Sequence, residues 1–263
     1  MKKVIISIIA LSFTFYSCKS DKSTEDKNED NQVEQEEVVE AKITLSKFEG
    51  SPKFEDAKIS ISSMNIGELD SVASVDFDFK VENYELGAQT PTAGENGLAN
   101  SGKGQHIHFI LNNMPYSAHY ESSFSKDMPE GNHVLLAFLS RSYHESVKNA
   151  FLVQNVNVGN VEDEGADLTA PHMFYSRPKG TYTGKDTEKL LLDFFLVNTE
   201  ISENGNKVKA TINGEEFMIT EWAPYVIEGL DKGEVEIRLQ LQDADGNMIE
   251  GPFNDVTRTV ILK

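Results

Sequence analysis

Cysteine and tryptophan are almost absent from this chain, with one residue of each among 263. Because Cys18 has no second cysteine to pair with, the sequence excludes a disulfide framework. Basic residues are also scarce: 24 Lys and Arg stand against 43 Asp and Glu, giving a formal net charge of −19. A field of that sign repels polyanions, so nucleic acid is not an expected partner.

The common catalytic motifs are missing as well. The sequence contains no G-x-S-x-G, no H-E-x-x-H and no P-loop. His144 and Glu145 are neighbours, and catalytic residues need not be close in sequence, so a hydrolase using this pair remains an alternative hypothesis. The sequence favours a protein that binds rather than one that catalyses.

The longest apolar run, Val4 to Phe15, is too short to span a bilayer as a helix and follows Lys2 and Lys3. This pattern predicts a secretory signal peptide over residues 1–17. Cys18 comes directly after Ser17, and the segment resembles the lipoprotein signals of the Bacteroidota. The resemblance implies that Cys18 is the lipid-accepting residue, that acyl chains anchor the protein in a bilayer, and that it is an outer-membrane lipoprotein facing the periplasm or the cell exterior. The alternative is an ordinary signal peptide with an unpaired thiol.

The segment after the signal is acidic. Residues 19–41 contain nine acidic residues, three lysines and no aromatic residue. Such a composition buries too little apolar surface to offset the entropy of ordering, so residues 18–41 are expected to form a disordered tether.

The remainder of the chain contains two copies of one module. LDFFLVNTEI (Leu192 to Ile201) aligns without gaps with FDFKVENYEL (Phe77 to Leu86), and KATINGEEF (Lys209 to Phe217) aligns with HFILNNMPY (His108 to Tyr116). Further along, DKGEVEIRLQL from Asp231 aligns with PEGNHVLLAFL from Pro129. Such self-similarity indicates a duplicated structural unit.

Each copy is a series of short strand-like runs separated by Asn, Asp and Gly turns, without long helical periodicity. This pattern predicts an all-β protein with two tandem immunoglobulin-like antiparallel β-sandwiches, covering residues 42–165 and 166–263. Lys42 to Phe48 is expected to be a strand of the first copy. FYSRPK (Phe174 to Lys179) is expected to begin the second, as an echo of FEGSPK (Phe48 to Lys53). The final hairpin, from Asp243, resembles that of many bacterial immunoglobulin-like modules.

Comparison of the copies identifies one unusual surface. In the second copy, Lys207, Lys209 and Thr211 alternate with apolar residues and should face solvent. The same alternation predicts an outward face in the first copy that joins two histidines, His106 and His108, to the apolar residues Ile110, Val134, Leu136 and Phe138. An apolar outward face needs a cover, which the inserted loop of residues 87–104, the second copy or a ligand could each supply.

The spacing of His106 and His108 places two imidazoles on one face of a strand, a common arrangement in β-sandwich metal sites. The surrounding segment is similar to uncharacterised periplasmic domains with an H-x-H strand. A metal needs at least a third ligand. The sequence offers His119, His133, His144 and His172, and His119 is the predicted one. Copper would be favoured by methionine thioethers, and zinc by Glu121 or Glu145. Alternatively, the histidines are structural residues that bond to their neighbours.

A second candidate site lies in the loop SRSYHESVK (Ser140 to Lys148), where Arg141, Tyr143, His144 and Glu145 gather a cation, an aromatic ring, an imidazole and a carboxylate. Loops at the ends of sandwiches commonly bind ligands. These four residues predict a binding module for an envelope protein, a peptide or a glycan. In the alternative interpretation, Arg141 simply pairs with Glu145 within an ordinary hairpin.

Overall fold

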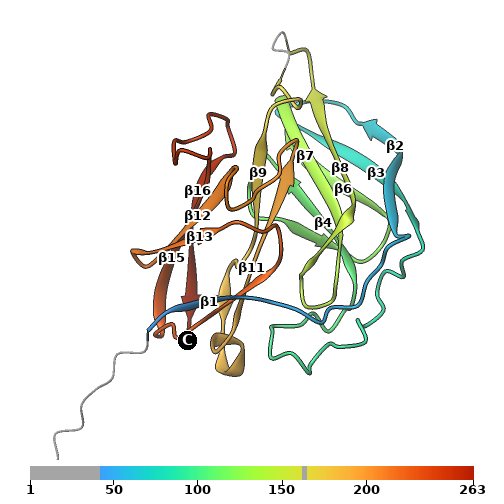
Figure 1. The fold of residues 1–263 in the computed structure, drawn as a ribbon. Helices are drawn as coiled ribbons and strands as arrows, with labels where there is room; N and C mark the ends of the chain where they lie inside the picture. The colour runs from blue at the N-terminus through green and yellow to red at the C-terminus, as the bar shows by residue number, and fades with distance from the viewer. Residues whose placement is uncertain (1–41, 162–164) are drawn as a thin grey trace, which may run out of the picture. The chain divides into compact units, whose positions relative to one another are not determined.

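The computed structural model describes residues 42–161 and 165–263, which belong to one compact unit. The predicted signal peptide, Cys18 and the acidic tether lie outside the described residues. Among the residues described, no helix is long and apolar enough to cross a membrane. The structure is all-β, as predicted, and consists of two sandwiches (Figure 1).

The first sandwich pairs two antiparallel sheets. The sheet β2-β3-β6 contains Lys58–Ile66, Val72–Glu82 and Ser123–Pro129. The sheet β5-β4-β7-β8 contains Ser117–His119, His106–Leu111, Gly131–Ser140 and Ser146–Val158. Strict alternation of buried and exposed residues along β3 turns one face of that strand to the core, as expected for a strand with one solvated face.

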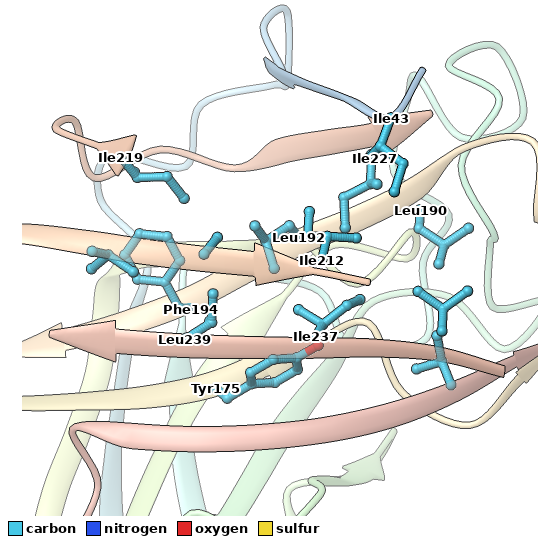
Figure 2. Packing of buried hydrophobic residues seen from close by; sticks show 14 of the residues in the cluster. Ile43, Tyr175, Leu190, Leu192, Phe194, Ile212, Ile219, Ile227, Ile237 and Leu239 are labelled. Carbon is cyan, nitrogen blue, oxygen red and sulfur yellow. The ribbon is translucent and has the colours of Figure 1, made fainter. Parts of the chain in front are cut away.

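The second sandwich repeats this plan and adds edge strands. The sheet β1-β14-β11-β9 contains Thr44–Lys47, Tyr225–Glu228, Leu190–Val197 and His172–Arg177. The sheet β10-β16-β15-β12-β13 contains Thr181–Tyr182, Asp255–Leu262, Gly233–Gln242, Lys207–Ile212 and Glu215–Ile219. A short 3-10 helix, η1, covers Gly184–Thr187. Figure 2 shows the core of this sandwich, including Tyr175, Phe194 and Ile237.

The duplication seen in the sequence extends to single hydrogen bonds. Asn112 and Asn213, which the alignment makes equivalent, both have positive φ angles, of 51° and 46°. Each side chain accepts a bond from the backbone N–H of an equivalent residue on the facing strand, Val134 at 2.8 Å and Glu236 at 2.9 Å. Asparagine tolerates this left-handed conformation better than most residues, so the same residue type closes the same turn in both copies.

The predicted boundary between the sandwiches is wrong at the N-terminal end. Strand β1 does not join the first sandwich. It pairs antiparallel with β14 at the edge of a sheet of the second; Figure 1 shows β1 as the blue strand at the start of the described chain. The expected echo of FEGSPK is wrong too, because the strand equivalent to β9 is β2: β9 pairs with β11 as β2 pairs with β3. A short alternating run fits either sheet edge, and its sequence does not specify the partner strand.

The apolar outward face of the first sandwich is buried against the second. Its residues form one cluster with side chains of β9, β11 and the last hairpin: Ile110, Val134, Leu136, Phe138, Phe174, Phe195, Val197 and Phe253. Phe138 and Phe195 stack with their ring centroids 5.0 Å apart. The second copy is therefore the cover that this face requires, one of the alternatives that the sequence left open.

Candidate functional site

Three histidines come together beside this interface. His106, His108 and His144 place one ring nitrogen each within 4.8 Å of the others. His106 and His108 are fully buried, and His144 is partly buried. Among the residues that the structure describes, this is the one group of three or more potential metal-binding side chains found this close together.

Strand β4 positions the first two imidazoles. Neighbouring strand β7 pairs with it so that His108 lies opposite Phe138 and His106 lies opposite Ser140. Residues opposite each other in an antiparallel pair share a face, so both imidazoles belong to the face that the second sandwich covers. The predicted alternation is thereby confirmed: His106 and His108 lie on one side of β4, and Ile107 and Phe109 lie in the core on the other.

The hairpin between β7 and β8 brings the third imidazole back to that face. The pairing of β7 with β8 shifts register between Phe138 and Ser140, just before the turn. In the turn, the His144 N–H donates to the Arg141 carbonyl at 2.8 Å, and His144 has a φ of 72°. A positive φ is uncommon for a residue other than glycine and concentrates at functional sites, where the surrounding structure maintains it.

Hydrogen bonds orient the rings toward one another. His106 Nδ1 lies 2.8 Å from the Gly104 carbonyl, which can only accept, so this nitrogen carries the proton and Nε2 carries a lone pair. His108 Nδ1 lies 3.3 Å from Ser176 Oγ of the second sandwich. The Nε2 atoms of His106 and His108 then face each other at 2.9 Å, and His144 Nδ1 lies 3.2 Å from His106 Nε2.

Burial keeps these rings neutral. It lowers the pKa of His106 to about 4 and, together with the adjacent imidazoles, holds the pKa of His108 well below its ordinary value. Burial also lowers the pKa of His144, and the positive charge of Arg177 adds to the effect. At neutral pH all three rings are therefore neutral, the form of histidine that binds a metal ion.

Aromatic rings and the inserted loop enclose the cluster. Tyr116 stacks on His108 with centroids 3.6 Å apart, and its hydroxyl lies 3.2 Å from His144 Nδ1. Tyr120 packs against His106 and bonds through its hydroxyl to Ser101 of the loop at 2.7 Å. The inserted loop thus lies beside this face, and it also supplies the carbonyl that orients His106.

Gly104, whose carbonyl orients His106, has to be glycine. Its φ is 87°, and a Cβ atom there would lie 2.2 Å from the Gly87 carbonyl oxygen, far inside contact distance. The close approach of the two chain segments at the base of the loop therefore fixes the acceptor for the His106 ring.

The prediction of His119 as the third ligand is wrong. Its partner on β4 is Ile107, so it lies on the opposite face of the sheet from His106 and His108. There it stacks on Phe124 at 3.4 Å between centroids and bonds to Ser117 Oγ at 2.8 Å. His144, which the sequence offered both as an alternative third ligand and as part of the ligand-binding loop, takes its place because the hairpin folds back.

The loop of Arg141, Tyr143, His144 and Glu145 is turned inward. Arg141 and Glu145 are buried and pair at 3.0 Å, which matches the alternative interpretation of an internal pair. Arg141 also donates to the Pro52 carbonyl, Glu145 accepts from Ser51, and the Tyr143 hydroxyl donates to Ser51. Three of the four side chains thus hold the hairpin against the segment before β2, and no contact favours them as a ligand surface.

No protein-family model matches this chain, and no curated protein matches it in sequence. Both copies are immunoglobulin-like β-sandwiches. Among solved structures, the chain is similar to the fibronectin(III)-like modules of CbhA from Clostridium thermocellum, with 14% identity over 78% of this chain and 94% of that one and a TM-score of 0.28. It is also similar to the two tandem V-type regions of the chitin-binding protein VCBP3, with 7% identity over 84% and 99% of the two chains and a TM-score of 0.24. The FN1–FN3 domains of chicken CNTN1 match at 9% identity over 81% and 68%, with a TM-score of 0.23. We draw no functional conclusion from likenesses at this level.

Proposed function

We propose that this protein binds a copper or zinc ion through His106, His108 and His144. The observation that carries the proposal is the convergence of three ring nitrogens from two separate segments, strand β4 and the β7–β8 hairpin. Two of these nitrogens approach to 2.9 Å. In a tetrahedral site with metal–nitrogen bonds of about 2.0–2.1 Å, ligand nitrogens lie about 3.3 Å apart, so a small outward movement of the rings would admit a metal.

The groups around the rings support this role. Metal-binding histidines usually donate their other ring nitrogen to a carbonyl or carboxylate, which fixes the ring and strengthens the ligand. His106 has such a partner in the Gly104 carbonyl, and His108 has the Ser176 hydroxyl. The strained backbone at His144 is a third supporting feature, because the hairpin adopts it with a histidine where glycine or asparagine is easier.

Imidazole is a ligand for both zinc and copper, and copper(II) generally binds a given nitrogen site more tightly than zinc. Glu145, which could have favoured zinc, is paired with Arg141 instead. We therefore expect both ions to bind, with copper the tighter.

Calorimetric titration of the full-length chain with each ion tests the proposal. The decisive variant is His144→Asn, because asparagine tolerates the positive φ of the turn and removes one ligand. We expect the affinity to fall at least tenfold, since a three-ligand site becomes a two-ligand site.

His119→Asn is the matched control, because it removes a partly buried imidazole from the other face of the same sheet. This variant should bind metal as the parent does, and any weak binding by surface acids is the same in all three proteins. Equal affinity in the parent and in His144→Asn would refute the site.

The cellular setting of this function is also part of the proposal. The Cys18 context supports a lipid-anchored envelope protein, placing the metal site outside the cytoplasm at an outer membrane. Metabolic labelling with a radiolabelled fatty acid tests this: label should enter the parent and be missing from Cys18→Ala.

A further inference from the structure

A second polar cluster lies beside the three histidines, and it consists of cations. Arg177 at the end of β9, Lys179 just after it and Arg258 on β16 gather around three tyrosine rings. Arg177 and Arg258 are only 6% and 9% exposed, and Lys179 is partly exposed, which opens the cluster to solvent. Tyr116 separates the cluster from the histidines: His108 stacks on its ring, and Lys179 Nζ lies 3.9 Å from the ring centroid.

In the described parts of the chain, no carboxylate lies within ion-pair distance of Arg177, Lys179 or Arg258. This is unexpected in a chain with 43 acidic residues and 24 basic ones. Buried charges are normally paired, because removing an unpaired charge from water costs on the order of several kcal/mol.

Arg177 has a free binding edge. Its Nη1 donates to the Tyr182 hydroxyl at 2.9 Å, whereas its buried Nε has no partner. The Nε and Nη2 side of a guanidinium is a fork that matches two oxygens of a carboxylate or phosphate. Tyr175, two residues earlier on β9, has a fully buried hydroxyl that also lacks a hydrogen-bond partner; Figure 2 shows its ring in the core of the second sandwich.

The cations also repel one another. Burial, followed by the charges of Arg177 and Arg258, lowers the pKa of Lys179 to about 8. Burial lowers the pKa of Arg258 to about 10. An anion in the cluster would relieve both the repulsion and the missing hydrogen bonds.

We propose that Arg177, with Lys179 and Arg258 beside it, binds a small oxyanion, a carboxylate or a phosphate group, at the free guanidinium edge of Arg177. This site is distinct from the three-histidine centre, and its ligand is of the opposite charge. Arg258 also donates to the backbone carbonyls of Asn113 and Ser176, which fixes it between the two sandwiches.

The test uses the full-length chain, freed of metal with 1,10-phenanthroline, a neutral chelator that cannot occupy an anion site. Sodium acetate and inorganic phosphate are titrated calorimetrically in the millimolar range, with sodium chloride at equal ionic strength as the reference. We expect saturable binding of one oxyanion, with the tighter of the two identifying its class. Arg177→Lys retains the charge but loses the fork, and should bind at least tenfold more weakly.

One control and one alternative variant complete the design. Arg238→Lys makes the same change at an exposed arginine that pairs with Asp255 and should bind as the parent does. If Arg177→Lys does not fold, Lys179→Gln, at a partly exposed position, should still weaken binding severalfold. The absence of saturable binding, equal binding by the Arg177 and Lys179 variants and the parent, or equal saturation by chloride would each overturn the proposal. Because no metal is present, failure of the histidine site leaves this result unaffected.

Discussion

Equivalent sheets of the two sandwiches have different surroundings. On the β12–β15 face of the second sandwich, the outward residues are polar and reach solvent, among them Lys209, Thr211 and Arg238. The equivalent outward residues of β4 and β7 in the first sandwich are fully buried: His108, Ile110 and Leu136. One scaffold thus presents a solvated face in one copy and an interface in the other.

The difference shows how duplication can create a site. The second copy covers the first, and the histidines at the end of the covered face lose their water and their protons together. On a solvated pair of imidazoles, protons would compete with a metal ion near neutral pH. The buried pair is not protonated at this pH. The binding chemistry therefore depends on the contact between the two copies.

The largest expected effect concerns Asp193, which is fully buried and bonds to Ser146 and Lys148 across the interface. We expect Asp193→Ala to lower the free energy of unfolding by about 4 kcal/mol, because it leaves a partly buried ammonium without its partner. The alignment makes Asp78 equivalent, but Asp78 is exposed and bonds only to Ser123. Asp78→Ala should cost less than about 1 kcal/mol. Urea denaturation compares the two, and similar losses would mean that the interface adds nothing at this position.

The next effect concerns the covered face itself. Leu136→Ala should cost about 3 kcal/mol, because it opens a cavity in the cluster between the sandwiches. Arg238→Ala, at the equivalent position of the second copy, removes only an exposed pair with Asp255 and should cost less than about 1 kcal/mol. The measurement is again urea denaturation, and a small loss for Leu136→Ala would argue that the two copies separate readily in solution.

The third effect is a dependence of stability on pH in the metal-free protein. In the unfolded chain His106 binds a proton below its ordinary pKa of 6.5, whereas in the folded chain burial delays this to about pH 4. The unfolded state then binds more protons, so stability falls as the pH drops from 7 to 5, by about 2 kcal/mol for His106 alone. His106→Asn should flatten this part of the stability profile, and an unchanged slope would show that the ring is protonated in the fold.

The smallest effect separates the two equivalent turns. Asn112→Ala and Asn213→Ala both lose a bond to the facing strand and place alanine at a positive φ. Asn112 also bonds to the buried His133 at 2.9 Å, so its replacement should cost about 1 kcal/mol more. Thermal and urea unfolding of both variants provide the comparison. Equal losses of unfolding free energy would mean that the bond with His133 does not stabilise the fold.

Much of this arrangement could be predicted from the sequence. Alternation along the strands, transferred from the plainer copy to the other, placed His106 and His108 on one face and predicted that Leu136 and Phe138 need a cover. This worked because the period of two in a strand fixes which face a residue occupies, whatever lies beyond it.

The remaining features depend on contacts between distant parts of the chain. His119 was misplaced because its face follows from the register of β5 on β4, which the sequence spacing does not reveal. His144 was only one of several possible third ligands, because the register shift that turns it back toward β4 has no clear sequence signal. Arg177 and Lys179 were noted only as part of a presumed echo, and their lack of acidic partners becomes visible once the strands are assembled.

The position of β1 has a consequence for synthesis of the protein on the ribosome. This strand is among the first described residues to leave the exit tunnel, yet its partner β14 belongs to the last part of the chain. The first sandwich can close while translation continues, whereas β1 has to wait, unpaired, until most of the second sandwich has been made. Completion of that edge is therefore a late step of assembly, and a truncated chain that lacks β14 would expose an unpaired strand near the start of the first sandwich.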